Sequence, residues 1–176
     1  RHLRVRGTGD ARAPFFTDQD EKRLLYELSQ MSNQNHLRLT KLALTTGFRR
    51  SELLSLTWRN IDLNKEKIYV QRKECATRGG SSSMRIVPLP SKAKKLLSSF
   101  GSKQGKVIPL TKGSARNGFD KARKSAGLET LRFHDLRHIA ISRMWSYGMN
   151  VLEISACSGH RDIKMLMRYS HYQLSF

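Results

Sequence analysis

Hydrophobic residues recur at helical spacing along most of this chain. The first such stretch follows Thr17, a candidate N-cap, and the acidic residues just after it suit the positive end of a helix dipole. Leu24, Leu25 and Leu28 then share one apolar face. The pattern therefore predicts a helix that begins next to Thr17 and buries its leucines.

Two further helices are predicted before residue 57. The first covers residues 37–45, with Leu39, Leu42 and Ala43 facing inward, and Gly47 ends it. The second follows at once through residues 52–56. Between them, Gly47 allows the tight turn that joins two packed helices.

Between residues 67 and 89 the hydrophobic residues recur at every second position, as in a β-strand. Ile68 and Val70 alternate with polar neighbours over residues 67–73, and residues 85–89 form a second β-type run. The intervening segment holds Gly79, Gly80 and three serines, which predicts a hairpin with a long flexible turn.

From Ser91 the pattern is helical again, interrupted by a short predicted strand at Val107-Ile108. The remaining helices are predicted over residues 114–125, 134–147, 151–156 and 163–167. No internal repeat is present. The predicted fold class is α+β, mainly helical, with one small antiparallel sheet.

The net charge of the chain narrows the range of functions that it can have. The chain of 176 residues holds 33 lysines and arginines against 14 acidic residues, a net charge of +19 and a pI near 10.6. Such an excess points to nucleic acid as the partner, and no long apolar run or signal peptide favours a membrane instead. Residues 1–13 carry four arginines without apolar periodicity and are predicted to be a basic linker or arm.

Cys75 and Cys157 match no metal spacing, so we expect two free thiols in a reducing compartment.

Three segments carry candidate chemistry. In the first, Arg49 stands at the start of a predicted helix, and Glu52 lies three residues on, where it can hold the guanidinium. An arginine at a helix N-terminus is suited to grip a phosphate oxygen. Taken alone, the pair is better explained as an ordinary surface ion pair on an amphipathic helix.

The second segment is Phe133-His134-Asp135-Leu136-Arg137-His138. His134 and Arg137 are three residues apart and share a helix face, so together they can donate to a non-bridging phosphate oxygen. His134 and His138 also have a spacing that can bind zinc, but no glutamate follows His134 and no third ligand is evident. Structural histidines are the other reading.

The third segment runs from Ser158 to His171, where Gly159 permits a turn that presents His160. Nine residues on, Tyr169 stands among basic and polar neighbours rather than in an apolar stripe. A phenol titrates near pH ~10, so a nucleophilic tyrosine needs nearby cations. A packing role for Tyr169 is the alternative.

Together, these segments resemble the tyrosine recombinase or phage integrase family from about Ala13 onward. Thr46 to Leu53 looks like the family's first box, His134 to Arg137 its His-x-x-Arg box, and Gly159-His160 its Gly-His pair. Tyr169 follows at the usual distance, with Ser-His after it. The order of four elements makes the likeness specific.

The resemblance implies a catalytic domain over residues 14–176 that breaks and rejoins DNA through a 3′-phosphotyrosyl intermediate, without metal, ATP or cofactor. It implies as catalytic residues Arg49, Lys73, His134, Arg137, His160 and Tyr169. Lys73 ends the first strand of the predicted hairpin, where the family carries its general acid. Because the loop after Lys73 is longer than usual, Arg78 and Lys67 remain alternatives for that role.

The resemblance also implies a partner, an oligomeric state and a cellular location. We expect double-stranded DNA as partner, a tetramer of the full-length protein on DNA, possible DNA-bending accessory proteins, and a bacterial cytoplasmic, nucleoid-associated protein. An N-terminal DNA-clamping domain is expected outside this chain. Arg161-Asp162 departs from the small hydroxyl residues common after the family's histidine, and the end at Phe176 puts assembly by this chain in doubt. A type IB topoisomerase and a non-catalytic DNA-binding module are the alternatives.

Overall fold

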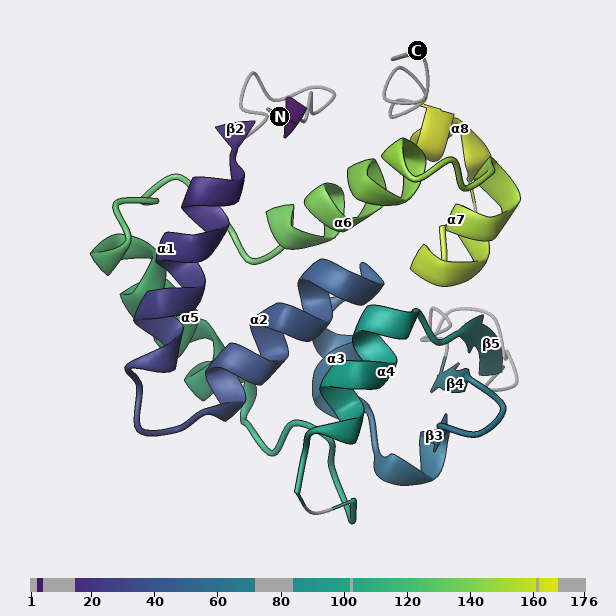
Figure 1. Ribbon diagram of the computed structural model, residues 1–176, viewed down its shortest axis with the longest axis horizontal. Coiled ribbons are helices and arrows are strands. Elements are labelled where there is room, and N and C mark those ends of the chain that lie inside the picture. Colours follow the sequence, from purple (N-terminus) through teal and green to yellow (C-terminus); the bar gives the residue numbers. More distant parts are fainter. Residues whose placement is uncertain (1–2, 5–14, 72–83, 102, 161, 168–176) are drawn as a thin grey trace, which may run out of the picture.

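The computed structural model describes residues 3–4, 15–71, 84–101, 103–160 and 162–167. Helices dominate this part of the chain, and one three-stranded antiparallel sheet lies at the side of the helical body (Figure 1). Its elements are β1 (Leu3–Arg4), β2 (Phe15–Phe16), α1 (Asp18–Ser29), α2 (Asn35–Thr46), α3 (Arg50–Ser55), a 3₁₀ turn (Trp58–Asn60), β3 (Ile61–Asp62), β4 (Lys67–Gln71), β5 (Met84–Pro88), α4 (Ser91–Ser98), α5 (Lys112–Ser125), α6 (Asp135–Ser146), α7 (Val151–Ser158) and α8 (Ile163–Met167).

Helix α1 begins as its sequence predicts. The Thr17 hydroxyl accepts a hydrogen bond from the Asp20 amide at 3.1 Å, and the Asp20 carboxylate accepts one from the Thr17 amide at 2.8 Å. This reciprocal capping satisfies two amides that the helix itself leaves free. Leu24 and Leu28 are fully buried, and Leu25 is partly buried against the core, so the predicted apolar face is present.

Helix α2 lies at the centre and packs against α1, α3, α4, α5 and α6. Leu39, Leu42 and Ala43 are buried on it, as predicted. Gly47 ends the helix in the left-handed conformation, with φ at 66°, a region where residues with a side chain are strained. The chain turns there directly into α3, so the C-terminal end of α2 and the N-terminal end of α3 are adjacent.

The predicted hairpin is present as β4 and β5, with Ile68 opposite Val87 and Val70 opposite Arg85. A third strand, β3, pairs with β4 and was not predicted, because two residues are too few to show a period. Residues 72–83, between the paired strands, lie outside the described residues.

The strand predicted at Val107-Ile108 is wrong. Both residues are buried, and the Val107 amide donates to the Leu56 carbonyl at 2.9 Å, but the segment forms only an isolated bridge between Thr57 and Lys106. Burial in the core, rather than pairing in a sheet, accounts for the apolar pair. A short apolar run does not distinguish the two cases.

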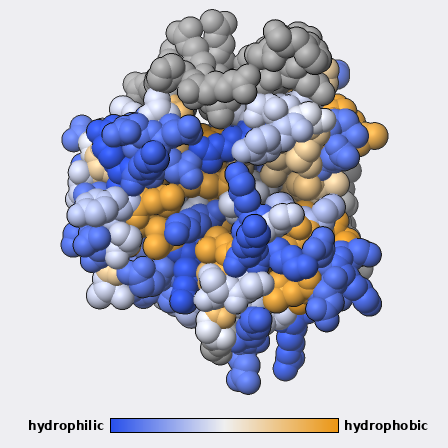
Figure 2. All heavy atoms as spheres, in the orientation of Figure 1, coloured by the Kyte–Doolittle hydropathy of each residue, from blue (hydrophilic) through white to orange (hydrophobic). Residues whose placement is uncertain are grey.

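The C-terminal half folds over α2. Helix α6 packs on α2 and leads to α7 and α8 on the side of the molecule that also holds β5 (Figure 1). Asn150 caps α7 with its side chain, and Gly159 ends it in the left-handed conformation, with φ at 72°. Hydrophilic side chains cover most of the face in Figure 2, with apolar patches between them. Within the described residues, no helix has the length and apolar character needed to cross a membrane.

Candidate active site

Arg49 is the N-cap residue of α3, and 46% of its side chain is exposed. Glu52, one turn later, accepts from the Arg49 amide at 2.8 Å and from Arg49 Nη1 at 3.3 Å. Burial alone would raise the pKa of Glu52, but the hydrogen bonds and charge of Arg85 and the contacts with Arg49 outweigh it and lower the pKa. Glu52 is therefore held as a carboxylate that fixes the direction of Arg49.

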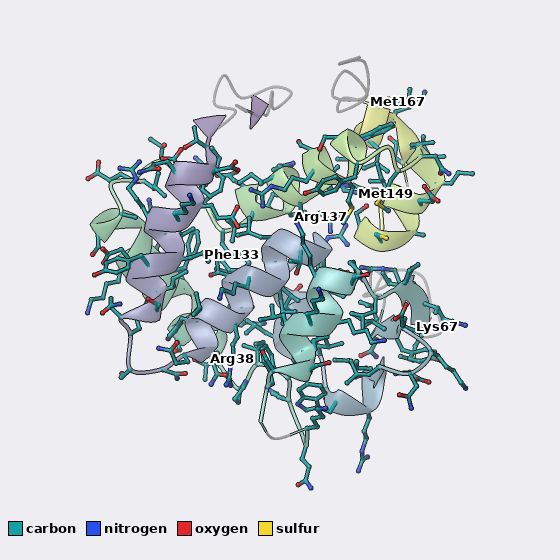
Figure 3. The ribbon with its side chains drawn as sticks, in the orientation of Figure 1. Arg38, Lys67, Phe133, Arg137, Met149 and Met167 are labelled. Carbon is teal, nitrogen blue, oxygen red and sulfur yellow. The ribbon has the colours of Figure 1, made fainter. Side chains whose placement is uncertain are left out.

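Arg137 is a buried arginine on α6, only 3% exposed. Its Nη1 donates to the carbonyl of Gly47 at 2.8 Å, and its Nη2 lies 3.2 Å from both ring nitrogens of His160. Figure 3 shows the side chain reaching from α6 toward the end of α2. The turn at Gly47 thus serves both guanidinium groups, because it leads into Arg49 and presents a carbonyl to Arg137.

His160 follows the turn at Gly159 and is held by Ser158. The Ser158 hydroxyl lies 2.8 Å from His160 Nδ1 and donates to the Ile154 carbonyl at 2.6 Å. Since the hydroxyl has one proton and the carbonyl can only accept, His160 Nδ1 must donate to Ser158. In the neutral ring Nε2 then carries no proton. Burial, followed by the charges of Arg137 and Arg49, lowers the pKa of His160 to about 4.

His134 and His138 complete a cluster of imidazoles. Their rings meet edge to face, with centroids 4.9 Å apart. Burial and then the neighbouring His134 and Arg137 lower the pKa of His138 to about 4, and burial with the charge of Arg137 also lowers the pKa of His134. For the zinc alternative, no group of three His, Cys, Asp or Glu suited to a metal ion occurs among the described residues.

These side chains line one cavity of about 740 Å³ between α3, α6, α7 and β5. The residues around it that bear on chemistry are Arg49, Arg85, His134, Arg137, His138 and His160. Three arginines line the cavity against two carboxylates, Glu52 and Asp162. Because Glu52 is already paired with Arg85 and Arg49, the cavity favours an anion. An anion placed there would also raise the pKa of each imidazole and turn it into a cationic donor.

Four of the six predicted catalytic residues, Arg49, His134, Arg137 and His160, therefore come together in the structure. The other two, Lys73 and Tyr169, lie outside the described residues, as does Arg78. Lys67, the remaining alternative for the general acid, lies at the start of β4 opposite Pro88 and is not part of the cavity lining.

Arg85, His138 and Ser158 were missed as members of the site. A signal for Arg85 existed, because the period of two in β5 puts this charged residue on the same buried face as Val87. A guanidinium at such a position requires buried partners. His138 was considered only as a zinc ligand, and Ser158 has no local pattern that separates it from any helical serine.

The chain is similar to known DNA recombinases. The phage integrase family model matches residues 14–175. The shufflon-specific DNA recombinase of Escherichia coli is 40% identical over 132 residues, 74% of this chain and 33% of that protein. The integrase of Escherichia phage 186 is 30% identical over 175 residues, 98% of this chain and 48% of that protein. The chain thus spans between about a third and a half of these curated relatives.

Among solved structures, the catalytic domain of bacteriophage HP1 integrase superposes with a TM-score of 0.74 at 28% identity, covering 92% of this chain and 89% of that domain. The XerA recombinase superposes with a TM-score of 0.68 at 20% identity, covering 94% of this chain and 61% of that chain. The mainly helical α+β fold with one small antiparallel sheet, expected from the sequence, is confirmed by this agreement.

Proposed function

Since the chain belongs to the phage integrase family, we propose that it is a catalytic domain that cleaves and rejoins DNA strands through a covalent bond between Tyr169 and a backbone phosphate. One observation carries the proposal. Arg49 and Arg137 come from different helices, and the imidazoles of His134 and His160 come from different segments, yet all four line a single cavity.

The scissile phosphate would lie between the two guanidinium groups. When a nucleophile adds to phosphorus, negative charge grows on the non-bridging oxygens, and donors already in place stabilise it. Arg49 is directed by Glu52, and Arg137 is anchored by the Gly47 carbonyl, so neither group has to reorganise as the charge develops. Loss of one such donor typically costs ~2.7–4 kcal/mol of transition-state stabilisation.

The histidines would act as donors only when the phosphate is present. Burial and the neighbouring arginines lower the pKa of His160 and of His138 to about 4, so both rings are neutral near pH 7. A phosphodiester carries a negative charge into the same space and favours the imidazolium. His160 would then donate from Nε2 while Nδ1 stays bound to Ser158.

In the proposed cleavage step, the Tyr169 phenol gives up its proton to water, its oxygen bonds to phosphorus, and the bond from phosphorus to the 5′ oxygen breaks. Lys73 would give its proton to the departing 5′ oxygen as general acid. The product is a 3′-phosphotyrosyl link and a free 5′ hydroxyl. A 5′ hydroxyl of another strand reverses the step, so no ATP is consumed, and the two arginines supply the charge that a divalent ion would otherwise bring.

Duplex DNA is the proposed partner, because a +19 chain with an anion-binding cavity suits a polyanion. We propose that the catalytic domain begins near residue 14 and that residues 1–13 form a basic arm. Assembly as a tetramer on DNA is proposed for the full-length protein only.

The test is covalent capture. A nicked duplex whose short 5′-hydroxyl fragment diffuses away after cleavage would trap the intermediate. We expect a protein–DNA adduct that survives denaturation and forms equally in EDTA. A non-catalytic DNA-binding module would bind the duplex and form no adduct, and a metal-dependent nuclease would lose cleavage in EDTA and regain it with magnesium.

A further inference from the structure

Arg85 is a buried guanidinium directly beside the proposed site. In β5 exposed and buried side chains alternate, and Arg85 stands in the buried phase with 6% of its side chain exposed. Taking a charge out of water is costly unless the group is paired and hydrogen-bonded. The groups that pair with Arg85 in the interior therefore indicate the role of this residue.

Those partners tie three elements together. Arg85 Nη1 donates to Glu52 Oε1 at 2.8 Å, and Nη2 lies 3.4 Å from both Glu52 Oε2 and the Cys157 carbonyl. The guanidinium also lies 5.2 Å above the ring of Phe48. Arg85 thus joins β5 to the first turn of α3 and to the last turn of α7, whose carbonyl end attracts a cation.

Gly159 packs against the Arg85 guanidinium and limits the space around it. A Cβ atom at this glycine would lie 2.6 Å from Arg85 Nη1 and 2.7 Å from its Cζ. The guanidinium is therefore packed flat against the turn that leads to His160. Its room to move is small, so the carboxylate it holds is also fixed.

Glu52 is shared between two arginines of different kinds. Its oxygens bind the buried Arg85 at 2.8 Å and the exposed Arg49 at 3.3 Å, and one of them also accepts from the Arg49 amide. The stronger and more buried pair is the one with Arg85. Without the pair with Arg85, Glu52 would lose the contact that sets the orientation of its carboxylate. Arg49 would then no longer be held in position by Glu52.

We propose that Arg85 is a positioning residue: it orients Arg49 through Glu52 and does not itself contact the scissile phosphate. The proposal rests on the proposed function of the cavity. Both terminal nitrogens of Arg85 are committed to Glu52 and the Cys157 carbonyl. Its Nε is buried without a hydrogen-bond partner among the described residues, so a direct phosphate contact is the alternative that the experiment must separate.

Three variants make the test. Arg85→Gln removes the charge, and Arg85→Lys keeps the charge but cannot bridge two acceptors with a planar fork. The matched control is Arg143→Gln. Arg143 is a half-buried arginine on α6 that pairs with Glu21 on α1, away from the cavity. Thermal unfolding of each variant reports the structural cost separately, and Arg85→Lys serves if Arg85→Gln does not fold.

The first measurement needs no DNA. The Arg49 amide donates to Glu52, so its hydrogen exchange, followed by NMR, reports whether Glu52 is in place. We expect faster exchange of this amide in Arg85→Gln and Arg85→Lys but not in Arg143→Gln. Unchanged exchange in both Arg85 variants overturns the proposal.

The second measurement is the single-turnover cleavage rate in two backgrounds. A misplacement of about 1 Å in a positioned group can cost roughly 100-fold in rate, and we expect a loss of this order in Arg85→Gln. In an Arg49→Ala background the same change should cost far less, because the group it positions is gone. An equal loss in both backgrounds overturns the proposal in favour of direct contact. If the wild-type protein forms no adduct, the proposed function fails, and the exchange measurement alone decides the role of Arg85.

Discussion

Replacing Arg137 by alanine should separate the stability of the site from its chemistry. Arg137 is buried and makes a 2.8 Å hydrogen bond to the Gly47 carbonyl, at the turn that sets the start of α3. The substitution leaves this carbonyl without that donor. It also removes one of the two guanidinium groups from the proposed phosphate site.

The two consequences have different magnitudes. A hydrogen bond from a charged group is worth ~1.5–3 kcal/mol of net stability. For a domain of this length, each kcal/mol corresponds to about 2–4 °C in Tm, so Tm should fall by several degrees. The loss of a preorganised donor to the transition state should cost ~2.7–4 kcal/mol, roughly 100- to 1,000-fold in cleavage rate.

A third consequence concerns His160. After burial, the charge of Arg137 is the largest cause of its lowered pKa. Removing that charge should therefore raise the pKa of His160, which NMR titration of the ring can follow. The pKa of His138, which Arg137 also lowers, should rise with it.

The assay is single-turnover cleavage at saturating protein, with DNA affinity measured separately. Arg137→Lys is the companion variant. The lysine can still donate to the Gly47 carbonyl and so keep part of the stability. Its cleavage rate should remain low, because an ammonium group cannot replace the planar guanidinium and its two terminal nitrogens. Arg116→Ala, which removes an exposed arginine of α5, controls for the loss of one charge. If Arg137→Ala cleaves at the rate of this control, Arg137 does not stabilise the transition state and the reasoning is refuted.

Three further outcomes are expected. DNA affinity should fall by ~10³–10⁵ between about 50 and about 200 mM salt if ~6–10 phosphates are contacted, and a flat response would exclude the basic surface as the docking face. Lys73→Ala should be slow on normal DNA but close to wild type when sulfur replaces the bridging 5′ oxygen, because that leaving group needs no proton; equal slowness on both substrates would exclude Lys73 as the acid. Because burial and neighbouring charges lower the pKa of His160 and His138 from 6.5 to about 4, the unfolded chain takes up protons at a higher pH than the folded chain. The free energy of unfolding should therefore fall as the pH drops from 6.5 toward 4, by less than about 1.4 kcal/mol per pH unit for each ring, since both rings are partly exposed and solvent screens them. Urea unfolding of wild type and His160→Gln at pH 7 and pH 5 checks this, and identical pH slopes would contradict it.

Local patterns predicted most of the helices because their signals are contained within a few residues. Thr17 and Asp20 form the cap of α1, and Gly47 and Gly159 end α2 and α7 in the left-handed conformation that favours glycine. The same local logic failed at Val107-Ile108, where burial without strand pairing gives an identical sequence pattern.

The site was predictable only as far as its segments could be recognised one at a time. Arg49 and its local partner Glu52 were paired correctly, since three residues separate them. The stronger partner of Glu52 is Arg85, which is 33 residues away, and no spacing in one sequence reveals such a contact. The same holds for the Gly47 carbonyl that anchors Arg137 across 90 residues.

The central claim is that Tyr169 is the nucleophile, and locating the covalent bond tests it most directly. The adduct formed on a nicked duplex would be digested with protease and nuclease, and the nucleotide-bearing peptide identified by mass spectrometry. The account predicts phosphotyrosyl DNA at Tyr169, and no adduct from Tyr169→Phe although this variant binds the duplex like wild type. An adduct that persists in Tyr169→Phe, with the nucleotide on Tyr172 or on any other residue, would contradict it.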